Sequence, residues 1–177
     1  MRTAQLCREF DLQVQNTGFP LHPDTPDSGM TLEEMFAGRF DLNAAMVRLR
    51  QVARELNLPF GDRSMTYNSR RAQELGKWAE LMGLGPEFHA AVYRAYFVDG
   101  LNIASLEVLT DIAGGIGLDA DQAGRVIMEK SYAEAVDADW RRSRALDVTA
   151  VPTVRYGDRR LVGFQPYQAY RTLISGS

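Results

Sequence analysis

Residues 151–163 read Val-Pro-Thr-Val-Arg-Tyr-Gly-Asp-Arg-Arg-Leu-Val-Gly, and this stretch decides the fold. Val151–Tyr156 is rich in the β-branched and aromatic residues that favour a strand. Gly157-Asp158 is a glycine-first pair that suits a two-residue hairpin turn, so Arg159–Gly163 is predicted to be the return strand. A short helix is predicted next, over Tyr167–Ile174.

The N-terminal 30 residues predict one more strand, followed by an irregular loop. In Phe10–Gln15, Leu12 and Val14 alternate with polar residues, which is the period-two pattern of a strand. Asn16-Thr17-Gly18 is a turn cluster that ends this strand. The proline-rich stretch Phe19–Pro26 can join neither a ladder nor a helix, so we expect an extended loop there.

Residues 31–147 are predicted to be almost wholly helical. Thr31-Leu32-Glu33-Glu34 is a capping box that starts a first short helix. The other predicted helices cover residues 44–56, 69–82, 87–98, 105–112, 119–128 and 131–146, and the first two of these carry an apolar stripe at helical spacing. The element order of strand, helical block, strand hairpin and helix indicates an α/β protein.

Composition excludes several classes of function. The chain has 177 residues, of which 45% are hydrophobic, so it can bury a sizeable core. Its net charge of -3 argues against a general nucleic-acid binder. One cysteine and two histidines predict no internal disulfide and no metal site, and no cofactor is predicted either.

The expected location follows from what the sequence lacks. The sequence contains no run of 18 apolar residues, so no membrane span is predicted. Met1-Arg2-Thr3-Ala4-Gln5 has no apolar signal core, so a cytoplasmic protein is the default expectation.

Four groups of residues, in this order along the chain, resemble the DsbA-like branch of the thioredoxin superfamily, in which a helical domain interrupts a thioredoxin fold. They extend from the loop after the first strand to the last helix, and they are Phe19-Pro20-Leu21-His22-Pro23, Arg94-Ala95-Tyr96-Phe97 with Asn102-Ile103, Val151-Pro152-Thr153, and Gly163-Phe164-Gln165-Pro166-Tyr167. The resemblance covers the chain from about residue 10 to its end.

The resemblance implies a thioredoxin-like fold with a large all-helical insertion. Residues 1–30 and 148–177 correspond to the thioredoxin-like part, and residues 31–147 to the helical insertion. In the family, a strand and a Cys-x-x-Cys at a helix N-terminus precede the strand that Phe10–Gln15 resembles. We therefore expect the first strand and most of the first helix to be absent, with Cys7 near the far end of that helix.

This departure from the family decides the expected chemistry. A dithiol oxidoreductase needs a thiolate activated at a helix N-terminus and a second cysteine that resolves the mixed disulfide. One cysteine cannot complete that cycle, so the chain is expected to be a redox-inactive relative of the protein-disulfide oxidoreductases. The first alternative is a noncatalytic peptide-binding or assembly module. The second is a relative of the glutathione-dependent 2-hydroxychromene-2-carboxylate isomerases, whose serine lies in the same missing segment.

The resemblance assigns Val151, Pro152 and Thr153 to substrate binding, through a cis peptide bond before Pro152 and the backbone of Val151. The substrate would be an extended peptide or a thiol, and no catalytic residue is predicted. Other chemistry-bearing side chains are interpreted as structural; these are Cys7, His22, His89, Met35, Phe36, Trp78, Tyr93, Tyr96 and Phe97. Arg141-Arg142-Ser143-Arg144, which follows Asp137 and Asp139, is interpreted as a solvated, salt-bridged helix face.

Loss of the first strand would expose two strand edges that face a gap. Unpaired edges are costly and recruit other chains. Phe10–Gln15 is therefore expected either to close on Val151–Tyr156 or to pair with another chain, and a homodimer is the favoured outcome.

Overall fold

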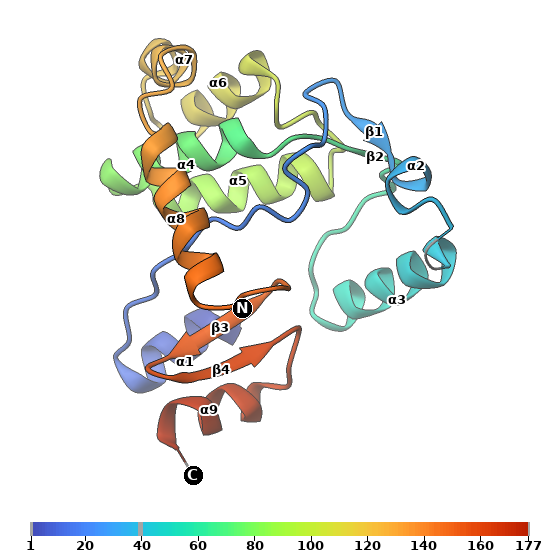
Figure 1. Ribbon diagram of the computed structural model, residues 1–177, viewed down its shortest axis with the longest axis vertical. Helices are drawn as coiled ribbons and strands as arrows, with labels where there is room; N and C mark the ends of the chain where they lie inside the picture. The colour runs from blue at the N-terminus through green and yellow to red at the C-terminus, as the bar shows by residue number, and fades with distance from the viewer. Residues whose placement is uncertain (1, 39–40, 177) are drawn as a thin grey trace. The chain divides into compact units, whose positions relative to one another are not determined.

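The computed structural model describes residues 2–38 and 41–176 and divides them between two compact units (Figure 1). One unit combines Met1–Leu21 with Asp137–Ser177, and the other is His22–Val136. The predicted domain division, 1–30 with 148–177 against 31–147, stays a prediction, because compactness alone does not define a unit that folds independently.

Helices dominate the described residues. In chain order the elements are α1 (Arg2–Phe10), β1 (Met30–Thr31), α2 (Leu32–Phe36), α3 (Leu42–Glu55), β2 (Met65–Thr66), α4 (Arg70–Leu81), α5 (Gly85–Phe97), α6 (Leu106–Gly115), α7 (Ala120–Met128), α8 (Ala133–Ala145), β3 (Thr153–Tyr156), β4 (Arg159–Val162) and α9 (Tyr167–Ser175).

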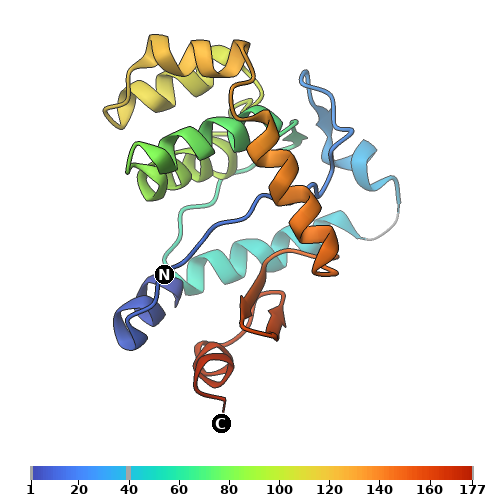
Figure 2. The ribbon, with the colours of Figure 1, turned by 60° about the vertical axis from the view of Figure 1, so that its left-hand side comes forward.

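Helices α4 to α7 form the core of the His22–Val136 unit. Figure 2 shows α4 beside α5 and α6 beside α7, and α4 also packs on α7. Leu75 of α4, Phe88 of α5 and Leu109 of α6 are at most 1% exposed, so these three helices meet through fully buried apolar side chains. The predicted helical insertion is therefore present, and its stability comes from the amphipathic stripes read in the sequence.

A capping box positions the start of α2, as predicted. The backbone N–H of Glu34 donates to Thr31 Oγ1, and the backbone N–H of Thr31 donates to Glu34 Oε2. These two hydrogen bonds favour the ionised carboxylate and lower the pKa of Glu34 below its ordinary value. Thr31 also belongs to the two-residue ladder of β1 and β2, so the cap and the ladder both fix the junction between β1 and α2.

The hairpin predicted from residues 151–163 is present in the unit that contains both ends of the chain. β3 pairs antiparallel with β4, with Tyr156 opposite Arg159 and Thr153 opposite Val162. Gly157 occupies the turn with φ +58°, a conformation that glycine adopts without strain. Helix α9 packs on both strands.

The strand predicted at Phe10–Gln15 is wrong. Helix α1 runs to Phe10, Asp11 turns the chain with φ +49°, and residues 12–20 form neither helix nor strand. In the described part of the chain β3 pairs only with β4, so this segment does not close on Val151–Tyr156. Alternation makes a segment suited to a sheet, but a strand needs a neighbouring edge to pair with. Pairing with another chain stays a prediction.

Two buried side chains of α8 hold the segment that follows α1. The backbone N–H of Gly18 donates to Asp139 Oδ2 at 2.7 Å, and Ser143 Oγ donates to the Gly18 carbonyl at 3.2 Å. Asp139 and Ser143 are 8% and 5% exposed and lie four residues apart, on one face of the helix. The interpretation of this run as a solvated face is therefore wrong at these two positions. We call this contact the Gly18 clasp.

No helix among the described residues is both long enough and apolar enough to cross a membrane.

The Gly18 clasp predicts a measurable stability difference. Asp139→Ala leaves the Gly18 N–H without its carboxylate partner, so we expect a loss of about 1.5–3 kcal/mol of unfolding free energy in urea denaturation. Asp111→Ala on the exposed surface of α6 is the matched control, and we expect a change within about 0.5 kcal/mol. Equal effects of the two substitutions would show that the clasp contributes nothing.

Candidate functional site

The Val151–Thr153 loop leads directly into β3. The peptide bond between Val151 and Pro152 is cis. Thr153 Oγ1 donates to the Ala150 carbonyl at 2.6 Å, and the Gly163 N–H donates to the Pro152 carbonyl at 2.8 Å. The backbone of the loop is therefore fixed at two points, whereas the Val151 side chain is 45% exposed.

The ladder register determines which backbone groups of β3 remain unpaired. Because the hairpin turn has two residues, Tyr156 and Arg159 are a hydrogen-bonded pair. Backbone groups point to alternate sides along a strand, so those of Val154 and the carbonyl of Pro152 also point toward β4. The bond from Gly163 to Pro152 agrees with this register. The polar backbone groups of Thr153 and Arg155 consequently point to the opposite edge, where no described residue pairs with β3.

The two faces of the hairpin differ in what covers them. Val154, Tyr156, Leu161 and Arg159 share one face, because paired residues project to the same side. Arg159 donates from Nη2 to the Ile174 carbonyl of α9, which places this face toward α9. Thr153, Arg155, Arg160 and Val162 lie on the other face, where Val162 is 45% exposed.

Cys7 is the only thiol in the sequence, and it lies in the second half of α1. It is half-buried, and it is not at the helix N-terminus, where backbone N–H groups would stabilise a thiolate. Its predicted place near the far end of the helix is confirmed.

Glu9, near the end of α1, links that helix to α9. Tyr167 Oη and Arg171 Nε both donate to the Glu9 carboxylate. The hydrogen bond to Glu9 favours the protonated phenol and raises the pKa of Tyr167 above its ordinary value. Sequence reasoning did not identify this triad, because Glu9 lies more than a hundred residues from Tyr167 and Arg171.

The two histidines make structural contacts within the helical unit. The His22 ring lies edge-on to Phe36 at 6.1 Å between ring centroids, and His89 Nε2 lies 3.2 Å from Glu80 Oε1. Among the described residues, no group of three or more His, Cys, Asp or Glu side chains could hold a metal ion.

The aromatic residues of α5 were interpreted as structural, and they do pack against one another. Tyr93 and Tyr96 each contact Phe97, with ring centroids 4.9 and 4.7 Å apart. The guanidinium of Arg63 lies 4.4 Å from the Tyr96 ring centroid, a cation–π contact that the sequence did not reveal. Trp78 is 2% exposed and belongs to the core.

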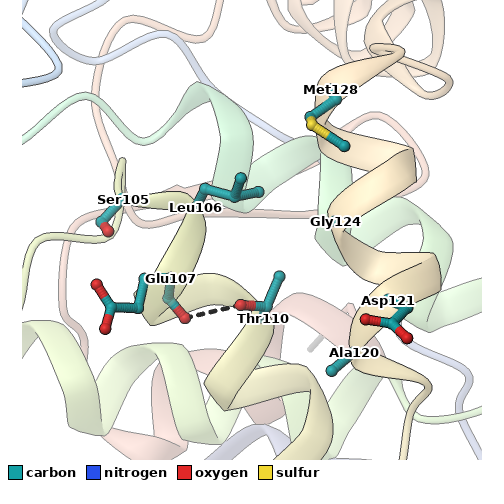
Figure 3. Close-up of a pocket in the computed structure, with 8 residues that line it drawn as sticks. All are labelled: Ser105, Leu106, Glu107, Thr110, Ala120, Asp121, Gly124 and Met128. Atoms are coloured by element: carbon teal, nitrogen blue, oxygen red, sulfur yellow. Dashed lines mark hydrogen bonds between the residues drawn. The ribbon is translucent and has the colours of Figure 1, made fainter.

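A groove of about 650 Å³ lies between α6 and α7 (Figure 3). Glu107, Thr110 and Asp121 are among the residues that line it, with Leu106 and Met128 toward one end. Thr110 Oγ1 donates to the Glu107 carbonyl at 2.9 Å, so its hydroxyl is engaged within its own helix. The groove thus offers no converging set of polar groups for a reaction.

A second hollow of about 720 Å³ is rich in charged residues, but those charges hold the protein together. Arg70 Nε donates to Glu74 Oε1 at 2.7 Å, and Arg71 Nη1 donates to the Ala104 carbonyl at 2.8 Å. Asn68 Nδ2 donates to the Thr25 carbonyl at 2.8 Å. The first bond lies within α4, the second joins α4 to a loop, and the third joins two loops, so all three are internal contacts of the fold. The Val151–Thr153 loop therefore remains the best candidate for a site.

A family described as the DSBA-like thioredoxin domain matches residues 2–175. The uncharacterized protein YwbO of Bacillus subtilis is 27% identical over 92 residues, which are 51% of this chain and 46% of YwbO. That match spans about half the length of the curated relative.

Two solved structures share the fold. One, described as a probable DsbA oxidoreductase of Streptomyces coelicolor, has a TM-score of 0.87 at 22% identity, over 99% of this chain and 81% of that one. The other is a 2-hydroxychromene-2-carboxylate isomerase, with a TM-score of 0.74 at 17% identity, over 99% of this chain and 84% of that one.

The contact between Glu9 and Tyr167 predicts a pH dependence. Because the folded-state pKa of Tyr167 is raised, its contribution to stability is present below the ordinary tyrosine pKa of about 10 and is lost as pH rises through the folded-state value. We expect Glu9→Gln to lower the pKa of Tyr167, measured from the phenolate absorbance that Tyr167→Phe removes. An unchanged pKa in Glu9→Gln would contradict the assigned cause.

Proposed function

Because this chain belongs to the family of DSBA-like thioredoxin domains, we propose that it holds an extended polypeptide at the Val151–Thr153 loop without itself performing dithiol–disulfide exchange. The fold is thioredoxin-like and mixed α/β, with the large helical insertion. The family match gives the oxidoreductase relationship, whereas the absence of exchange by this chain and the polypeptide ligand are proposals.

The observation that carries the proposal is the free edge of β3 beside an exposed loop. The loop backbone is fixed by the Thr153 and Gly163 hydrogen bonds, so it is preorganised and little ordering is needed on binding. An extended peptide placed there can add to the edge through main-chain hydrogen bonds, whose formation does not depend on the ligand's sequence.

The proposed lack of exchange rests on the balance of the reaction. Oxidation of a substrate dithiol transfers two electrons to a protein disulfide, and this chain has one sulfur for that purpose, Cys7. A mixed disulfide at Cys7 would have no second thiol in the chain to release it. Cys7 also lies away from the helix N-terminus, where a reactive thiolate would be stabilised.

The remaining alternative is an isomerase that uses glutathione, because this chain shares its fold with a 2-hydroxychromene-2-carboxylate isomerase. No described contact favours glutathione over a peptide, so we rank this alternative second. Calorimetric titration with glutathione distinguishes the two, since a measurable heat would support it. The cytoplasmic location also stays a prediction.

Enzyme assays test the proposed lack of exchange. We expect insulin reduction by dithiothreitol to proceed at the same rate with the chain, with Cys7→Ser, and without added protein. Turnover by the unmodified chain that Cys7→Ser abolishes would contradict the proposal and would imply that two Cys7 thiols act together.

Binding assays test the polypeptide ligand separately. Thr153→Pro removes an N–H that points to the free edge and also the hydroxyl bond to Ala150 that fixes the loop, while the β4 ladder bonds stay in place. We therefore expect at least about fivefold weaker binding of a labelled, alkylated insulin B chain. Asp158→Ala at the hairpin tip is the matched control and should bind normally. Fluorescence anisotropy gives the affinities, and thermal melting shows whether both variants are folded. Equal affinities would contradict the proposed site.

A further inference from the structure

Two hollows of the His22–Val136 unit adjoin each other beside helix α7. Leu106 and Met128 line both of them, so these two side chains form the boundary between the hollows. Leu106 is 37% exposed, and Met128 is 66% exposed. Methionine is unbranched and flexible, so a methionine side chain that stands this far out of the surface is suited to enter a recess on another molecule.

The first hollow, the groove between α6 and α7, is a recess of the required kind. Figure 3 shows Met128 at one end of the groove and Asp121 near the other end, with Gly124 between them on α7. Gly124 has no side chain, and a Cβ built there would lie 3.7 Å from Thr110 Cγ2 on the opposite helix. The Thr110 hydroxyl is already bonded within α6. An apolar side chain can therefore lie on this floor without burying a free hydrogen-bonding group of Thr110.

We propose that two copies of the chain form a two-fold dimer through α7, in which Met128 of each copy lies in the α6–α7 groove of the other, over Gly124. The contact is reciprocal, because the protruding side chain and the recess belong to the same helix. It therefore closes as a dimer instead of growing into a filament. The contact uses α6, α7 and the residues directly after α7, so it is separate from β3 and from the Val151–Thr153 loop.

The pairing of Met128 with Gly124 fixes how the two copies of α7 align. A two-fold axis that crosses the helix at a right angle makes the two copies antiparallel. Antiparallel alignment then places Lys130 of each copy opposite Gln122 of the other, directly beside Asp121. Helix α7 has nine residues and is about 13 Å long at 1.5 Å per residue, so these contacts fit along one helix.

Charge favours a second copy as the occupant of the groove. Asp121 lines the first hollow and Lys130 lines the second, so the carboxylate and the ammonium lie on opposite sides of Met128. Both side chains are exposed, and neither has an ion-pair partner among the described residues. A two-fold axis exchanges the two sides, so it brings the acidic side of each copy to the basic side of the other. The surface is thus complementary to itself.

The other charged residues of the two hollows do not oppose this arrangement. In the second hollow Arg70 bonds Glu74 at 2.7 Å, and Arg71 lies 3.3 Å from Asp27, so these charges cancel in pairs. Glu107 lines the first hollow and adds a second carboxylate to the acidic side.

The size of the contact predicts a weak, concentration-dependent dimer. Two short helices from each copy bury less than the roughly 1,200 Å² of a standard stable interface. The two exchanged charge pairs are exposed to solvent, so raised salt should weaken the dimer further.

Sedimentation velocity with methionine variants tests the role of Met128. The unchanged chain should dimerise with increasing concentration. Met128→Ser should raise the dissociation constant at least about tenfold, because each dimer loses two buried apolar side chains. Met82→Ser is the matched control, since Met82 is also exposed, lies at the end of α4 and lines neither hollow. We expect this control to dimerise as the unchanged chain does.

Charge exchange tests the register without altering Met128. Lys130→Glu and Asp121→Lys each place like charges opposite each other at two contacts, so each variant alone should dimerise at least about fivefold more weakly. An equal mixture of the two variants restores opposite charges at both contacts, so it should recover most of the dimer. A mixture of Lys130→Glu with Asp111→Lys is the matched control, because Asp111 is exposed on α6 but lines neither hollow, and it should show no recovery.

Four results would overturn the proposal. A monomer at every concentration would mean that the groove holds another polypeptide or nothing. Equal dimerisation of Met128→Ser and the unchanged chain would place the interface elsewhere. Full dimerisation of either charge variant alone, or no recovery in their mixture, would exclude the antiparallel register. The substituted side chains are all exposed, and thermal melting of each variant shows whether it is folded.

Discussion

A strand directs alternate peptide groups to its two sides, and each of those groups must find a partner or remain in water. In this protein β3 satisfies that requirement on one side only, through β4. The Val151–Thr153 loop leads directly into this half-paired strand. The half-paired strand is thus the constraint on which the candidate site depends.

The segment after α1 meets the same requirement in a different way. Instead of a ladder, side chains of α8 satisfy the Gly18 peptide groups, with a carboxylate for the N–H and a hydroxyl for the carbonyl. Burial of Asp139 is tolerated because its charge receives a hydrogen bond. Side chains of α8 therefore supply the hydrogen-bond partners that a neighbouring strand would supply in a sheet.

The elements with the strongest local signals could be predicted from the sequence. The Gly157-Asp158 turn fixes the β3–β4 register, and the Thr31–Glu34 capping box fixes the start of α2, because each depends on residues close together in the chain. The family resemblance, carried by groups spread along the chain, predicted the thioredoxin-like fold and the helical insertion. Val151 and Pro152 are exposed and Thr153 is half-buried, and their assignment to substrate binding stays a prediction.

Features that depend on distant partners could not be predicted in this way. The alternation at Leu12 and Val14 is a true sheet pattern, but whether it becomes a strand depends on an edge elsewhere. Asp139 and Ser143 looked solvated because they lie among arginines, and only the position of Gly18 explains their burial. The contact between Glu9 and Tyr167 likewise joins two distant residues, and no local sequence pattern indicates that they meet.

The Gly18 clasp also bears on the order in which the chain folds. Its two hydrogen bonds span sequence separations of 121 and 125 positions. Helices α4 to α7, in contrast, are consecutive in the chain and pack on near neighbours. Contacts between near neighbours form early, because little chain entropy is lost in closing short loops, and distant contacts form late. The contacts between the segment after α1 and helix α8 are therefore the last to form. Until then apolar side chains of α1 and α9, among them Leu6 and Leu173, are exposed, and this is the stage at which a newly made chain is most open to aggregation or to a chaperone.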